Sequence, residues 1–106
     1  MGKYLFQASY TAEGTKGLAR DGGSGRRESV EKAVAGLGGK LESFYYAFGD
    51  VDAYVIADLP DHEAATALAL TVNQSGAATV KTVILMTVKE VDNAAKKAVQ
   101  YRPPGG

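Results

Sequence analysis

The fold is decided by residues 40–61, which have the sequence KLESFYYAFGDVDAYVIADLPD. Residues 40–48 and 52–58 are rich in aromatic and β-branched side chains, as strands are. Between them stand Gly49 and Asp50, residue types that permit the tight turn of a β-hairpin. Asp61 then provides a side chain suited to cap a helix. The stretch therefore predicts two antiparallel strands followed directly by the start of a helix.

The part of the chain before this hairpin predicts one strand and one helix. Residues 3–10 alternate between two faces, which indicates a strand. The glycine-rich residues 11–25 follow, and we expect a long polar loop there, since loops of this length are functional or disordered. Ser24 is then the expected cap of a helix over residues 26–37, which Gly38 and Gly39 end.

The part after the hairpin predicts a helix, a strand and a tail. The second helix runs from Asp61 to Gly76, and the fourth strand covers residues 78–87. Thr87 and Glu90 have the spacing of a capping box, so a third helix is expected over residues 88–100. We accordingly divide the chain into a domain at residues 1–87 and a helix with a Pro/Gly tail at residues 88–106.

Two β-α-β units in this order predict an α+β protein of the ferredoxin-like class, βαββαβ, with a four-stranded antiparallel sheet. Both main helices then cover one face of the sheet. If the rows Phe44, Tyr46 and Phe48, or Tyr4 and Phe6, point away from the helices, the other face is too apolar for a monomer. We therefore expect a homodimer or a larger homo-oligomer.

Composition excludes several classes of function. Lys plus Arg and Asp plus Glu number 12 each, so the chain has no excess of positive charge that would favour binding to nucleic acid. The chain has no Cys and one His, which argues against a metal site or another cofactor. No apolar run approaches the length of a membrane helix, and the N-terminus lacks the pattern of a signal peptide. A cytoplasmic protein is the expectation.

The chain resembles the GYD-domain family of small bacterial proteins over residues 3 to about 88. The family's name comes from a Gly, Tyr-Asp signature, and Val51 stands here in the place of that tyrosine, so its hydroxyl is missing. The resemblance implies a dimeric α+β barrel and no particular activity. It rests on residues 10–18 (YTAEGTKGL), 38–41 (GGKL), 48–52 (FGDVD) and 59–61 (LPD).

Two sets of candidate site residues follow from the residue types. The glycine-rich loop and the helix start after it could hold a phosphate or carboxylate through backbone N–H groups and arginines, although basic residues there oppose the helix dipole and a plain surface loop is the alternative. The ligand-binding candidates are Tyr10, Glu13, Arg20, Arg26 and Arg27.

A phenol beside a carboxylate could serve as an acid and a base, which makes Tyr46, Asp52 and Tyr54 the catalytic candidates. Tyrosines are also ordinary strand residues, and Asp52 is equally suited to fix the turn. His62, in the first turn of the second helix, is expected to be a solvated side chain rather than a haem ligand.

Three functions stay open at this level. The first is an oligomeric module that binds a small molecule or a protein partner through the barrel interior or the glycine-rich loop. The second is a cofactor-independent enzyme, an oxygenase or isomerase that uses tyrosines and an acid in the barrel. The third is a nucleotide sensor like the PII signalling proteins, which depends on fold analogy alone.

Overall fold

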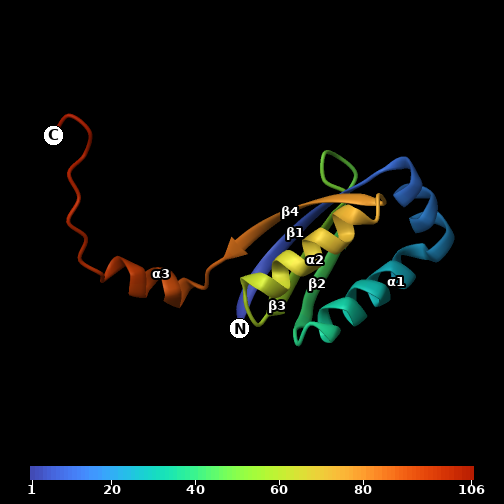
Figure 1. Cartoon of the computed structure of the whole chain (residues 1–106), viewed down its shortest axis with the longest axis horizontal. Coiled ribbons are helices and arrows are strands. Elements are labelled where there is room, and N and C mark those ends of the chain that lie inside the picture. Colours follow the sequence, from blue (N-terminus) through green and yellow to red (C-terminus); the bar gives the residue numbers. More distant parts are fainter.

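The computed structural model describes residues 1–106 and contains four strands and three helices, which alternate much as the sequence predicts (Figure 1). In chain order they are β1 (Gly2–Tyr10), α1 (Ala12–Gly36), β2 (Lys40–Tyr46), β3 (Ala53–Leu59), α2 (His62–Gln74), β4 (Ala78–Leu85) and α3 (Val88–Ala95).

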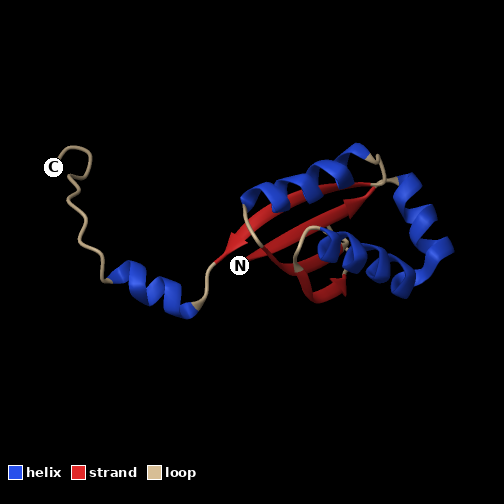
Figure 2. Cartoon of the chain, turned by 60° about the horizontal axis from the view of Figure 1, so that its bottom comes forward, coloured by secondary structure: helices blue, strands red, loops and turns tan.

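The strands form one antiparallel sheet in the order β2-β3-β1-β4. Helices α1 and α2 lie on the same side of this sheet, as Figure 2 shows. The predicted α+β, ferredoxin-like fold is confirmed. The hairpin that decided it is present, with β2 and β3 joined by residues 47–52.

The predicted loop at residues 11–25 is wrong, because this segment is helical. Helix α1 begins after Thr11, whose hydroxyl accepts a hydrogen bond from the Gly14 N–H at 3.2 Å. Ser24 therefore lies inside the helix and does not cap it. The helix bends at Gly22, where φ is 77° and ψ is 165°, a combination that only glycine adopts readily. Local composition opposes a helix here, and packing against the rest of the chain overrides it.

The predicted starts of the other two helices are correct. The Asp61 carboxylate accepts from the Ala64 N–H at 2.8 Å and caps α2. Thr87 and Glu90 form the predicted capping box at the start of α3. The third helix ends at Ala95, short of the predicted end at residue 100.

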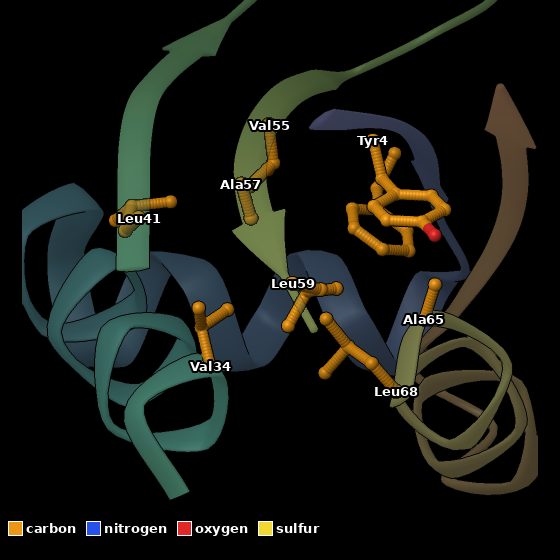
Figure 3. Close-up of a cluster of buried hydrophobic side chains, with 9 residues drawn as sticks. Tyr4, Val34, Leu41, Val55, Ala57, Leu59, Ala65 and Leu68 are labelled. Carbon is orange, nitrogen blue, oxygen red and sulfur yellow. The ribbon is translucent and has the colours of Figure 1, made fainter. Parts of the chain in front are cut away.

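The core lies between the sheet and the two helices, and Figure 3 shows its side chains meeting from β1, β2, β3, α1 and α2. Tyr4 and Phe6 belong to it, so this row faces the helices. A bulge between Leu41 and Ser43 shifts the alternation of β2, and both Leu41 and Phe44 pack on the core side. The most deeply buried residues are Val34, Ala57 and Leu59.

The other face of the sheet has no helix of this chain over it (Figure 2). Leu5 stands there between Ile56 on β3 and Val83 on β4, which are its partners in register. Helix α3 and the tail extend away from the sheet (Figure 1), and α3 contains no buried residue. None of the three helices has both the length and the apolarity to cross a membrane.

Candidate functional site

A cavity of about 460 Å³ lies between α1, α2 and the covered face of the sheet. Its floor is built by alternate residues of β1, Phe6, Ala8 and Tyr10, which share one face of that strand. Apolar side chains of the two helices and the neighbouring strands form most of its walls, among them Val30, Ala33, Phe44, Val55, Leu68 and Val72. The volume is in the range of cavities that hold small molecules.

The first half of α1 borders one end of this cavity. The residues before the bend, 12–21, cross the ends of β1 and β4 and contribute Gly14 and Gly17 to the lining. Gly14 lies so close to the residue before β4 that a Cβ atom would come within 1.8 Å of the Ala77 carbonyl oxygen. Thr11 reinforces this contact, since its N–H donates to the same oxygen at 3.0 Å and its hydroxyl donates to Gly76 O at 2.8 Å.

The charged groups of the cavity gather at that end. Four charged side chains line it: Glu13, Arg20, Asp21 and Arg26. Arg26 is half-buried and the other three are exposed. The Arg26 Nη1 atom is 3.9 Å from Asp21 Oδ2, a single long ion pair. The guanidinium is thus the charged group placed nearest the apolar interior.

A second, smaller cavity of about 340 Å³ adjoins the first through Tyr10, which lines both. It is formed by the bend of α1 and the loop between β2 and β3, and it contains Tyr46 and Asp52. The Tyr46 hydroxyl donates to the Gly23 carbonyl at 2.9 Å, and the Asp52 Oδ2 atom accepts from the Tyr10 N–H at 2.8 Å. The first bond joins the end of β2 to α1, and the second joins the hairpin loop to β1.

The two phenols near Arg26 are kept protonated. Burial raises the pKa of Tyr10 above its ordinary value, the Asp52 charge adds to this rise, and the Arg26 guanidinium opposes it. Burial also raises the pKa of Tyr46, with a further contribution from Tyr10. Both side chains are therefore hydrogen-bond donors at neutral pH and do not serve as bases.

Four of the five ligand-binding candidates come together in the structure: Tyr10, Glu13, Arg20 and Arg26 all line the larger cavity. Arg27, the fifth, does not line it. Their role in binding stays a prediction. Its original reason was a group of free N–H groups where a helix starts after a long loop, whereas α1 starts at Ala12 and is interrupted at Gly22.

The three catalytic candidates are divided between the two faces of the sheet. Tyr46 and Asp52 share the smaller cavity. Tyr54 pairs with Gln7 and Tyr45 in register, lines neither cavity and lies on the face without helices. A site that includes all three would need that face to be covered by something else.

Other side chains of the cavity were not singled out from the sequence. Asp21 stood in the supposed loop, and Ser29 lies one turn beyond Arg26 on the same side of α1. The helical spacing of residues 26, 29, 30 and 33 was the signal that could have found Ser29.

His62 is exposed, as expected, but it is not free. Its Nδ1 atom and the Tyr4 hydroxyl are 2.6 Å apart and share a hydrogen bond. The two rings also meet edge to face, with centroids 5.8 Å apart. His62 therefore ties the start of α2 to β1, and no group of three His, Asp or Glu side chains converges on a metal position.

The fold and the cavity define a ferredoxin-like α+β protein with a hollow between its helices and its sheet. The chain belongs to the GYD domain family, whose model matches residues 4–95. This match covers all of the sheet except the first two residues of β1, and it includes both covering helices and α3. Neither a curated protein nor a solved structure matches the chain.

Proposed function

We propose that this GYD-domain protein binds a small, mainly apolar molecule in the cavity between α1, α2 and the sheet. The observation that carries the proposal is the cavity itself, about 460 Å³ with apolar walls and a few polar groups at one end. Binding sites for small molecules have this composition, because apolar walls supply affinity and a few polar groups fix the orientation.

The state of the polar groups favours binding over proton-transfer chemistry. Both phenols are protonated at neutral pH, since the ordinary pKa of tyrosine is about 10 and burial raises the pKa of Tyr10 and of Tyr46 further. The carboxylate of Asp52 already accepts from the backbone of β1. A nucleotide sensor receives less support, because its phosphate site depended on a glycine-rich loop that is helical.

The direct test fills the cavity. Ala69 on α2 lines it, so Ala69→Phe should occupy the space and abolish binding of a neutral apolar probe, 1-octanol, in amide NMR titrations. Ala67, on the same helix, is exposed and does not line the cavity, and Ala67→Phe is the matched control. The proposal fails if 1-octanol does not shift the amide signals of the lining residues, or if Ala69→Phe binds it as the wild-type protein does.

We also propose that the chain is a homo-oligomer, in which a second copy covers the open face of the sheet. The face has an apolar row formed by Leu5, Ile56 and Val83, and Tyr54 is 38% exposed beside it. The same face has charges of both signs, Lys3 beside Glu42 and Asp58. In a symmetric dimer the positive group of each copy can therefore face the negative groups of the other. Membership of the family also favours this assembly.

Sedimentation measures this assembly. The wild-type chain should form at least a dimer at micromolar concentration, and Ile56→Lys should dissociate it, since the change puts a charge in the middle of the apolar row. Leu70→Lys, at an exposed position of α2 on the other side of the sheet, should leave the mass unchanged. A wild-type chain that sediments as a monomer contradicts the assembly.

A further inference from the structure

We infer that the ligand of the larger cavity is a monoanion, a carboxylate on an apolar tail, with its headgroup at Arg26 and Tyr10. The inference depends on the proposed function, because it specifies which molecule the cavity takes. The direction of the cavity, the donors at its polar end and the balance of charge there support it.

The cavity has one polar and one apolar end, so it fixes the direction of a long ligand. Along its floor the lining changes from Tyr10 through Ala8 to Phe6. This step of four residues corresponds to about 13 Å of strand. The headgroup therefore lies beneath the bend of α1, and the tail runs between Leu68 and Val55 toward the core.

The half-buried polar side chains at this end, Arg26 and Tyr10, are both donors. Arg26 presents a planar guanidinium whose fork of N–H groups fits the two oxygens of a carboxylate. The Tyr10 phenol beside it can donate a further hydrogen bond. Asp21 meets Arg26 only through the contact at 3.9 Å, so this ion pair leaves most N–H groups of the guanidinium without a carboxylate partner.

The charge balance favours a single negative charge. Two basic side chains, Arg20 and Arg26, and two acidic ones, Glu13 and Asp21, line the cavity, so their formal charges cancel. Only Arg26 of the four is half-buried. A carboxylate that binds Arg26 leaves one negative charge in excess at this end of the cavity, whereas a dianionic phosphate leaves two close to Asp21.

The experiment compares four probes with the same octyl tail: octanoate, 1-octanol, octylamine and octyl phosphate, each titrated by calorimetry against the full chain. We expect octanoate to bind about 10- to 100-fold more tightly than 1-octanol, the range for hydrogen bonds to a charged group. Octylamine should bind most weakly. The assignment is overturned if 1-octanol or octylamine equals octanoate, or if octyl phosphate binds more tightly than octanoate.

Two arginines next to each other in the chain provide a matched pair of variants. Arg26→Gln should remove the preference for octanoate and lower the affinity for 1-octanol far less. Retained binding of 1-octanol then shows that the cavity is intact. Arg27→Gln, outside the cavity, should change neither affinity. If Arg26→Gln retains the octanoate preference, or if Arg27→Gln removes it equally, the headgroup site is misplaced.

Asp21 supplies an independent test with the opposite sign. Asp21→Asn frees Arg26 from its ion pair, so octanoate should bind about two- to fivefold more tightly. Glu28→Gln makes the same change in net charge, but Glu28 pairs with Lys32 and does not line the cavity, so it should have no such effect. Equal gains in both variants would show that only the net charge matters.

The two proposals fail in different ways. If none of the four octyl probes binds, the cavity is not a binding site and the proposed function is wrong. If 1-octanol binds in the cavity while octanoate has no advantage, the proposed function stands and the anionic headgroup is refuted.

Discussion

Replacing Gly14 by alanine tests the contact that holds the first half of α1 against Ala77, the residue before β4. An added Cβ atom would lie 1.8 Å from the carbonyl oxygen of Ala77, whereas Cβ atoms essentially never come closer than 3.0 Å to another atom. The two segments would therefore have to separate by about 1.2 Å, the difference between these distances. That movement stretches the hydrogen bonds of Thr11 to Gly76 and Ala77.

The expected loss is the balance of three effects. Overpacking costs about 1–3 kcal/mol, and a weakened hydrogen bond costs about 1 kcal/mol. Alanine recovers about 1 kcal/mol, because it is the better helix former. The net destabilisation of Gly14→Ala is then about 2 kcal/mol, which lowers Tm by roughly 8–16 °C in a domain of this size.

Gly17 provides a control of opposite sign in the same helix. The nearest atom to its added Cβ is the Arg20 Nη2 atom at 3.9 Å, an ordinary contact. Gly17→Ala should therefore stabilise the protein by about 1 kcal/mol through helix propensity alone. Both variants are measured by urea denaturation followed by circular dichroism. If Gly14→Ala is as stable as the wild type, the contact with Ala77 is refuted; if Gly17→Ala destabilises, residues 12–21 are not helical.

Two further predictions concern titration and capping. Because the pKa of Tyr10 is raised in the folded state, its protonated phenol contributes stability below about pH 10, and this stability is lost as the pH rises through the pKa of the folded state. Tyr10→Phe should make this alkaline loss of stability smaller. Urea midpoints above about pH 9 that fall equally in both proteins would contradict the prediction. Asp61→Ala removes the cap of α2 and should lower the free energy of unfolding by about 1 kcal/mol, while Asp92→Ala on α3 should change it little.

How much of the site the sequence could predict differs from one residue to the next. Tyr10, Glu13, Arg20 and Arg26 were proposed as ligand-binding residues on the assumption of a loop, and they line one cavity although the segment is a helix. Tyr54 was grouped with Tyr46 because both are strand tyrosines near Asp52. The sheet separates them, since side chains of opposite phase lie on opposite faces.

What the sequence determined by itself is the order of elements and the fold class. Alternation defined the strands, Asp61 and the pair Thr87 and Glu90 marked two helix starts, and these signals act between residues close in the chain. The tertiary structure alone decided that residues 12–21 are helical, and with that the shape of the cavity. The reason is that the helical segment 12–21 packs against Ala77, far along the chain, through Gly14. Such contacts outweigh the local preference of glycine against helix.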